Sequence, residues 1–590
     1  MGDRSGAKRN KYVIGVDYGT LSARAVLVSV DGGQVMAESV YAYPHGILRR
    51  LGEPAGRAAT GRKESDKFTA EDETVGSAAV EGELSACACE ELPADYALQE
   101  IDDYEEALYH TIQAVVEQSG CQAEDVIGIG IDVTSSTFLP IAENGEPLCR
   151  MEAFRANPHA RLKLWKHHGA QEQADRITAL ATWRREKFLM RCGGRVNAEW
   201  MLPKLLEIAE KAPEVYEATD NFMEAGDYLV SLLTGQVTRC MCHAGYKLLW
   251  NEEDGYPSVD FLKALHPRLA SLQEKLKGKE LQVGECAGKL TEEAAKRLGL
   301  KAGTAVAASL IDAHVAVPSV GIHDGDKALM ILGTSCCMLL CSEKLAYIKG
   351  ISGCVKDAVL PGLYAYEAGQ SAVGDLFDWF VRNCVPGSYE REASEKGISL
   401  HTLLSEKASQ LVPGESGLVA LDWWNGNRSC LADAKLSGMI LGMTLRTKPE
   451  EIYRALLEAA AFGMKAIFEE FRNGGITAKQ LYACGGIVGK NPFMMQLYAD
   501  ILGQTIHTCS TEQGSAFGAA IYAAVAAGVQ EGGCTSVKEA SRVMGKGGGR
   551  KFTPIPANVA AYESLYREYK TLHDYFGTGG NEVMHRLREQ

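Results

Sequence analysis

The sequence predicts an α/β fold with two similar lobes around a central cleft. Two stretches carry this prediction: KYVIGVDYGTLSARAVLVSV at 11–30 and KALMILGTSCCMLL at 327–340. In each, an apolar strand enters a polar turn containing Gly-Thr and a nearby Ser, and a second apolar strand follows. One such hairpin is weak evidence, but one early in each half of the chain indicates a duplicated lobe. A chain of 590 residues is long enough for two cores.

Composition narrows the classes of protein. With 46% hydrophobic and 23% charged residues the chain is globular. Its net charge of -15 disfavours nucleic acid and anionic membranes as partners, because little would offset phosphate repulsion. No apolar run reaches transmembrane length, and the N-terminal MGDRSGAKRN lacks the apolar core of a signal peptide. The scattered cysteines suggest reduced thiols, so we expect a cytoplasmic protein.

The turn of the first hairpin has the residues expected of a phosphate-binding loop. Gly19 lets backbone N–H groups approach a phosphate closely, and Thr20, Ser22 and Arg24 can add hydroxyl donors and positive charge. Asp17, where the first strand ends, could hold a hydrated Mg²⁺, which keeps several waters and contacts few protein oxygens. An ordinary surface hairpin with a polar turn is the alternative.

The segment from Arg49 to Glu91 differs from its surroundings. It is rich in Ala, Gly, Glu and Ser, and Phe68 is its only aromatic residue. Such a stretch buries too little apolar surface to offset its ordering entropy, so we predict a flexible insertion. Helical periodicity returns at 101–118.

Polar side chains follow two further strands in the N-terminal half. The strand 126–131 leads into Asp132 and the cluster Thr134 to Thr137, and the strand 304–310 leads to Asp312. Open α/β sheets bind ligands at the carboxyl ends of their strands. A hydrogen-bonded turn is the alternative at the first of these ends.

Between these strands the helix predicted over 197–209 begins with a capping Asn, and Pro203 within it predicts a start or a kink. Lys204 follows, and a lysine on a helix is by itself most simply a solvated residue. The cluster Cys240, Cys242 and His243 is a weak metal candidate, since no second ligand pair stands at a suitable spacing.

In the C-terminal half, Glu367 lies among small residues in 363–374. The strand 481–484 enters Gly485 and Gly486, and Asn491 and a helix to 502 follow. Two glycines between a strand and a helix allow a flat ring such as adenine to lie against the backbone, and a simple tight turn is the alternative. Small residues from 514 predict a closely packed helix. Apolar residues at helical spacing from 562 to 576 predict a helix docked on its own lobe, with a homodimer contact as the alternative.

In this order the motifs resemble the FGGY carbohydrate kinases of the actin/hexokinase/Hsp70 superfamily. The resemblance runs from Lys11 to about Gly579. It rests on GVDYGTLSARAVLV, GIGIDVTSSTFLP, NAEWMLPKLLE, IDAHVAVPSVG, ILGTSCCMLL, YEAGQSAVGD and ACGGIVGKNPFMMQLYADILG. Within the family the chain is most similar to members that phosphorylate L-ribulose in L-arabinose catabolism, because the stretch from Asp132 to Pro140 has their form and not that of xylulokinases or glycerol kinases.

The resemblance implies two ribonuclease H-like (actin-like ATPase) lobes. The N-terminal lobe, 11–321, would bind the sugar and contain the insertion at 49–91, which is longer than the family usually has. The C-terminal lobe, 322–579, would bind ATP with Mg²⁺ and end in the C-terminal helix. The implied partners are L-ribulose and ATP, with no nucleic acid and no membrane.

The resemblance also implies roles for individual residues. The first phosphate loop would contain Asp17, Gly19 and Thr20, with Asp17 at the metal. The second phosphate loop would contain Gly333 and Thr334, and the adenosine motif would contain Gly485, Gly486 and Asn491. The sugar would contact Ser135, Lys204, Asp312 and Glu367, with Asp312 also the general base. Ser135 stands where related chains often carry Ala, so one sugar contact would differ.

Two alternatives stay open. One is a kinase for another ketopentose or a pentitol, such as D-ribulose, xylulose or ribitol. The other is an actin-like ATPase without a sugar acceptor, in which Lys204, Glu367 and the polar cluster after Asp132 have no evident role.

Overall fold

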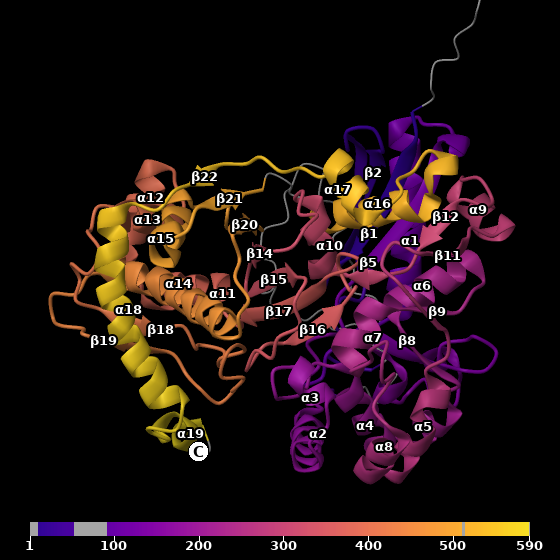
Figure 1. Cartoon of the computed structure of the whole chain (residues 1–590), viewed down its shortest axis with the longest axis horizontal. Helices are drawn as coiled ribbons and strands as arrows, with labels where there is room; N and C mark the ends of the chain where they lie inside the picture. The colour runs from indigo at the N-terminus through magenta and orange to yellow at the C-terminus, as the bar shows by residue number, and fades with distance from the viewer. Residues whose placement is uncertain (1–9, 52–90, 510–513, 589–590) are drawn as a thin grey trace, which may run out of the picture.

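The computed structural model describes residues 10–51, 91–509 and 514–588. Each half of the chain builds a seven-stranded mixed sheet with helices packed on it, and the two sheets form the centres of two lobes. In Figure 1 the N-terminal lobe lies to the right and the C-terminal lobe to the left.

The strands of the N-terminal half are β1 (Tyr12–Tyr18), β2 (Ser22–Ser29), β3 (Val35–Ala42), β4 (Leu98–Gln99), β5 (Val126–Val133), β6 (Phe138–Ile141), β7 (Leu162–Lys163), β8 (Asn221–Glu224), β9 (Thr238–Cys240), β10 (Lys279–Leu281), β11 (Cys286–Lys289), β12 (Ala305–Ala307) and β13 (Leu310–Ile311). Its helices are α1 (Ile101–Ser119), α2 (Gln171–Arg184), α3 (Phe188–Arg191), α4 (Met201–Lys211), α5 (Pro213–Ala218), α6 (Ala225–Thr234), α7 (Met241–Leu248), α8 (Val259–Leu265), α9 (Glu292–Leu298) and α10 (Asp312–Ser319).

The strands of the C-terminal half are β14 (Lys327–Leu332), β15 (Cys336–Ser342), β16 (Gly353–Lys356), β17 (Tyr364–Gln370), β18 (Val419–Leu421), β19 (Met439–Leu441), β20 (Gln480–Cys484), β21 (Ile506–Thr508) and β22 (Lys551–Phe552). Its helices are α11 (Gly374–Cys384), α12 (Gly387–Lys396), α13 (Leu400–Ser409), α14 (Pro449–Asn473), α15 (Pro492–Leu502), α16 (Gly514–Ala527), α17 (Val537–Met544), α18 (Pro556–Gly577) and α19 (Val583–Arg588).

The two sheets repeat one topology. The N-terminal sheet has the order β3-β2-β1-β5-β12-β11, and the C-terminal sheet contains β17-β15-β14-β20-β21-β22. In both, the hairpin strands pair antiparallel, the next two strands run parallel to the first hairpin strand, and the last strand is antiparallel. The predicted duplicated lobe and the α/β fold class are therefore confirmed.

The small-residue helix α16 packs closely, as its composition predicts, but its neighbour is the N-terminal sheet. A Cβ atom on Gly15 of β1 would lie 1.8 Å from the Ala516 oxygen, and one on Gly130 of β5 would lie 2.1 Å from the Ala519 oxygen. In Figure 1, α16 accordingly lies beside β1 and β5, and α17 packs against α16. The predicted boundary at 321/322 thus separates the two sheets. Helices α16 and α17 lie within the predicted range of the C-terminal lobe, 322–579, but pack on the N-terminal lobe.

Several boundaries differ from the sequence prediction for local reasons. The helix predicted from Asn197 begins at Met201, because the Asn197 side chain accepts the Glu199 N–H at 2.9 Å and forms a turn before the helix. Of the predicted insertion 49–91, residues 52–90 lie outside the described residues. Its two ends are paired, since Arg50 and Glu91 form an antiparallel bridge.

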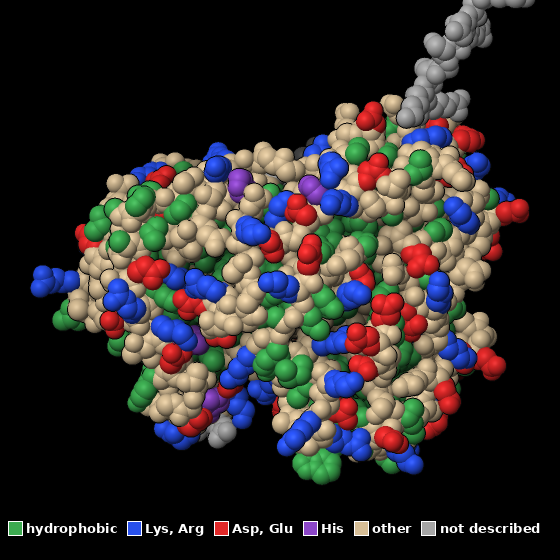
Figure 2. All heavy atoms as spheres, viewed as in Figure 1, with side chains coloured by type: hydrophobic (Ala, Val, Ile, Leu, Met, Phe, Trp, Pro, Cys, Tyr) green, Lys and Arg blue, Asp and Glu red, His purple; other side chains and the backbone are tan. Residues whose placement is uncertain are grey.

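The C-terminal helix α18 docks on its own lobe, as predicted. Tyr562, Tyr566 and Tyr569 are buried in the hydrophobic core that also contains the C-terminal sheet. None of the helices in the described parts of the chain is both long and apolar enough to span a membrane. On the face shown in Figure 2, acidic and basic side chains are interspersed.

Candidate active site

Three carboxylates gather at one edge of the N-terminal sheet. Asp17 in β1 is the register partner of Asp132 in β5, and Asp312 directly follows β13, whose Leu310 pairs with Asp132. Asp17 was predicted to begin the turn, but β1 continues through Tyr18, so Asp17 is held within the sheet. The strand pairing therefore fixes these carboxylates close together.

Burial and mutual repulsion control the ionisation of this group. Burial raises the pKa of Asp312 to about 7, and repulsion by Asp17 contributes to the increase. Burial also raises the pKa of Asp132 well above its ordinary value, helped by the charges of Asp17 and Asp312. The Asp312 Oδ1 accepts the Ala313 N–H at 2.7 Å, which fixes the orientation of this carboxylate. Asp312 is thus a carboxylate suited to accept a proton near neutral pH.

The same edge suits a hydrated cation. Asp132 is fully buried, and its carboxylate interacts directly with that of Asp17 on the neighbouring strand. The Arg24 Nε lies 3.7 Å from the Asp17 Oδ2 and offsets part of the negative charge there. Among the described residues, no group of three or more His, Cys, Asp or Glu side chains is placed to hold a metal ion. This also applies to the cluster of Cys240, Cys242 and His243. A cation at Asp17 and Asp132 would therefore keep much of its water, as Mg²⁺ does.

Glu367 reaches the N-terminal lobe from β17. Its Oε2 lies 3.4 Å from the Lys247 Nζ on α7 and 3.5 Å from the His314 Nε2 on α10. Burial would raise the pKa of Glu367, but Lys247, His314 and Arg428 outweigh it and lower the pKa. Sequence reasoning missed these two partners, because they belong to helices remote in the chain and carry no local motif.

Lys204 is completely buried, which corrects the simple interpretation as a solvated lysine. Its Nζ donates to the backbone oxygens of Ser136, Leu164 and Trp165 at 3.1, 2.8 and 3.2 Å. These three bonds match the three N–H donors of an ammonium group. Lys204 therefore holds the polar loop after β5 in place. In the same loop, the Oγ of Ser135 is buried without a hydrogen-bond partner among the described residues.

Each of the two Gly-Thr turns is closed by a hydrogen bond from its glycine. The Gly19 N–H donates to the Ser22 oxygen at 3.0 Å, and the Gly333 N–H donates to the Ser335 oxygen at 2.9 Å. The Thr20 Oγ1 accepts the Trp165 indole N–H at 3.2 Å. The second turn is fastened to the start of α11, because the Val373 N–H donates to the Thr334 oxygen at 2.8 Å and the Gly374 N–H donates to the Gly333 oxygen at 3.0 Å.

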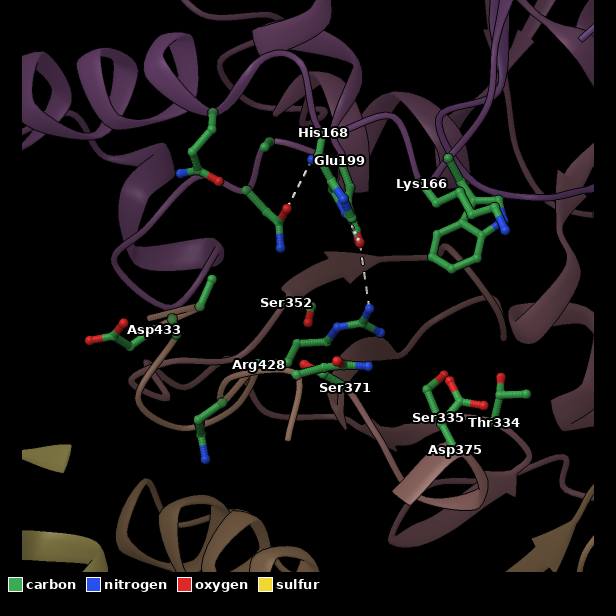
Figure 3. Close-up of a pocket in the computed structure, with 18 of the residues that line it drawn as sticks. Lys166, His168, Glu199, Thr334, Ser335, Ser352, Ser371, Asp375, Arg428 and Asp433 are labelled. Atoms are coloured by element: carbon green, nitrogen blue, oxygen red, sulfur yellow. Dashed lines mark hydrogen bonds and ion pairs between the residues drawn. The ribbon is translucent and has the colours of Figure 1, made fainter. Parts of the chain in front are cut away.

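Both turns open on one cavity of about 1060 Å³ between the lobes. The N-terminal lobe contributes Thr20, Trp165, Lys166, His168, Glu199 and Trp200, and the C-terminal lobe contributes Thr334, Ser335, Ser352, Ser371 and Arg428. Figure 3 shows Thr334, Ser335 and Arg428 around this space. The predicted cleft between two phosphate turns is therefore present. Of the predicted site residues, Thr20 and Thr334 line it, and Asp17 lies on the strand that leads into the first turn.

The predicted adenosine motif lies next to the second turn. Gly485 has a φ of 109°, and a Cβ there would lie 2.3 Å from the Leu332 oxygen, so the ends of β14 and β20 require a glycine to approach this closely. A Cβ on Gly486 would have no atom of the described residues within 4 Å. The Asn491 side chain accepts the Met494 N–H at 3.0 Å and caps α15.

One further residue of the cavity was not predicted. Arg428, in the loop between β18 and β19, places its Nη2 3.6 Å from the Oε1 of Glu199 in the N-terminal lobe. The same Glu199 oxygen lies 3.0 Å from the His168 Nε2 (Figure 3). Burial would raise the pKa of Glu199, but Arg428 and His168 lower it to about 2. The sequence of this loop has no helical or strand periodicity from which the position of Arg428 could be predicted.

Known families and relatives account for nearly the whole chain. Residues 73–318 match the N-terminal domain and residues 328–527 the C-terminal domain of the FGGY family of carbohydrate kinases. A ribulokinase from Halalkalibacterium halodurans is 48% identical over 579 residues, covering 98% of this chain and 97% of the relative. A ribulokinase from Mycolicibacterium smegmatis is 43% identical and covers 98% of this chain and 96% of the relative.

Solved structures support the same fold. The xylulose kinase of Rhodospirillum rubrum superposes with a TM-score of 0.73 at 21% identity, covering 98% of this chain and all of that one. The glycerol kinase of Plasmodium falciparum, solved with ADP, superposes with a TM-score of 0.70 at 15% identity, covering 96% of this chain and 99% of that one. At such identities the similarity establishes the fold alone.

Proposed function

Because the chain belongs to the FGGY family of carbohydrate kinases, we propose that it transfers the γ-phosphoryl group of ATP to L-ribulose, giving L-ribulose 5-phosphate in L-arabinose catabolism in the cytoplasm. The relatives named ribulokinase, at 43% and 48% identity over nearly the full chain, support this choice of acceptor. The observation that carries the proposal is the placing of Asp312, with a pKa of about 7, on the carboxylate edge that begins at the first Gly-Thr turn.

In this reaction Asp312 is the general base. As the acceptor hydroxyl oxygen attacks the γ-phosphorus, its proton passes to the Asp312 carboxylate and the bond between the γ-phosphorus and the bridging oxygen of ADP breaks. Burial keeps the pKa of Asp312 near neutrality, so the carboxylate is a stronger proton acceptor than an exposed aspartate. The loss of water from a closed cleft would suppress transfer to water instead of sugar.

The remaining residues bind and orient the two substrates. Gly19 and Gly333 would let the backbone of the two turns approach the phosphates of ATP, and the Thr20 and Thr334 N–H groups would contact them. The Gly19 and Gly333 N–H groups themselves close the turns by donating to the Ser22 and Ser335 oxygens. Mg²⁺ would supply charge neutralisation of the phosphates, and Asp17 together with Asp132 would hold its water ligands.

We assign the adenosine to the backbone of Gly485 and Gly486, with Asn491 shaping that site through its cap on α15. We assign the sugar to Ser135, Asp312 and Glu367. Lys204 would act on the sugar through the loop that it fastens, because its three donors are already bound to backbone oxygens.

A coupled assay of ADP formation tests the proposal. With Mg²⁺ and ATP alone the enzyme should turn over slowly, and L-ribulose should raise the rate strongly and more than D-ribulose, xylulose or ribitol. A higher kcat/KM for another pentulose or pentitol would assign the acceptor to that sugar. Equal rates with and without every sugar would support a nucleotide-driven ATPase instead.

A further inference from the structure

Arg428 lines the cavity between the two lobes from the C-terminal side. It lines the cavity together with Thr334 and Ser335 of the second Gly-Thr turn. The charges of Glu199 first, and then of Glu367, raise the pKa of the Arg428 guanidinium, so the group lies within electrostatic range of a residue that we assign to the sugar. In Figure 3 the guanidinium points away from its own loop, across the cavity toward Glu199.

The guanidinium has bonding capacity left. Its ion pair with Glu199 spans 3.6 Å, which is longer than a hydrogen bond, and an arginine presents five N–H donors. The side chain is 23% exposed and faces the cavity, in contrast with Arg454, which is almost fully buried and donates to the Glu458 side chain at 2.8 Å. Arg428 can therefore donate to a ligand without losing a strong internal bond.

The surroundings also require a positive charge. Asp17, Asp132, Asp312 and Glu367 give the reaction site an excess of carboxylates, while the transferring phosphoryl group carries charge on three equatorial oxygens. A planar guanidinium matches two phosphoryl oxygens at once, and an arginine in this position lowers the barrier to transfer by stabilising charge that develops in the transition state.

We propose that Arg428 is a further catalytic residue, which donates hydrogen bonds to the γ-phosphoryl oxygens during transfer and releases its ion pair with Glu199 to do so. This proposal rests on the proposed function. No covalent bond to Arg428 forms: the γ-phosphorus moves from the ADP oxygen to the sugar oxygen, the proton goes to Asp312, and Arg428 keeps its charge throughout.

The test compares Arg428→Ala and Arg428→Lys with Arg195→Ala as the matched control. Arg195 also lines the cavity, but its guanidinium is committed to the Ala432 oxygen at 2.7 Å and to Asp175 at 3.2 Å. Arginines that contact a transferring phosphoryl group contribute about 10³-fold or more to kcat, and we expect Arg428→Ala to lose that much with little change in either KM. Arg428→Lys should recover only part of the rate, and Arg195→Ala should retain it.

A second measurement separates catalysis from folding. Binding of ADP with Mg²⁺, aluminium fluoride and L-ribulose, which imitates the transition state, should weaken in Arg428→Ala, while binding of ADP alone and the melting temperature should not change. A kcat near that of the unchanged enzyme, or a loss confined to KM, would overturn the proposal. If the unchanged enzyme itself shows no sugar-dependent turnover, the proposed function fails, and this outcome is distinct from a failure at Arg428 alone.

Discussion

The two lobes have the same sheet but different chemistry at matching positions. In the N-terminal sheet, Asp17 near the end of the first hairpin strand, β1, is paired with Asp132 of the parallel neighbour, β5. In the C-terminal sheet the same pairing joins Ile331 with Cys484. Gly-Thr turns follow the first hairpin strand in both lobes, so the turn that we propose to bind phosphate is duplicated, whereas the carboxylate edge is not.

This difference distinguishes the backbone turns, which both lobes share, from the carboxylate side chains, which only the N-terminal sheet has at these positions. A strand end followed by a glycine turn offers backbone donors in either lobe, because its geometry depends little on the neighbouring side chains. Proton transfer and metal binding need carboxylates in a particular electrostatic setting, and that setting exists where β1, β5 and β13 meet. Under the proposed function, nucleotide binding would use both lobes, whereas proton transfer and metal binding would use one edge.

The largest effect should come from Asp312→Asn, which keeps the shape of the side chain but cannot take the hydroxyl proton. We expect kcat to fall by about 10² to 10⁴-fold, the usual contribution of a general base, while ATP affinity measured by calorimetry stays the same. Cys484→Ser, at the matching sheet end of the C-terminal lobe, is the control and should retain the rate. A kcat of Asp312→Asn close to that of the unchanged enzyme would remove Asp312 from the mechanism.

Asp17→Asn should act mainly through the metal. A residue that holds water ligands of a cation typically changes metal affinity by about 10 to 100-fold when replaced, so the Mg²⁺ concentration that gives half-maximal rate should rise by that order. Titrating the rates of Asp17→Asn and of the unchanged enzyme with Mg²⁺ at one fixed total ATP concentration measures this shift. Unchanged Mg²⁺ dependence would place the cation elsewhere.

Lys204→Met should affect stability more than transfer. Removing the ammonium leaves the buried oxygens of Ser136, Leu164 and Trp165 without their donor, and such orphaned groups cost about 1–3 kcal/mol. Urea unfolding should show this loss, and the KM for sugar should rise as the loop after β5 loosens. A rise in KM with full stability would instead make Lys204 a direct sugar contact.

Local patterns were sufficient to predict the fold class and the two Gly-Thr hairpins. The Gly-Thr hairpins and the strand before Asp132 could be predicted, because apolar runs and turn residues act locally. The partners of Glu367 could not be predicted, since Lys247 and His314 meet it only through the packing of the two lobes. Arg428 was missed for the same reason, because its loop has neither periodicity nor a turn motif.

The packing of α16 on the N-terminal sheet could not be predicted from the sequence either. Its small residues predict close packing but cannot say which sheet provides the glycines that allow it. The match of Gly15 and Gly130 to the Ala516 and Ala519 backbone becomes visible only in three dimensions.

The pH dependence of kcat/KM for the sugar tests most directly the claim that the carboxylate edge performs the chemistry. A base must be deprotonated to act, and burial with repulsion by Asp17 raises the pKa of Asp312 to about 7, so activity should be lost as the pH falls through that value. The account predicts an acid limb with an apparent pKa near 7, and no such limb in the residual activity of Asp312→Asn. A profile of the unchanged enzyme that stays flat down to the ordinary aspartate value of about 4 would contradict it.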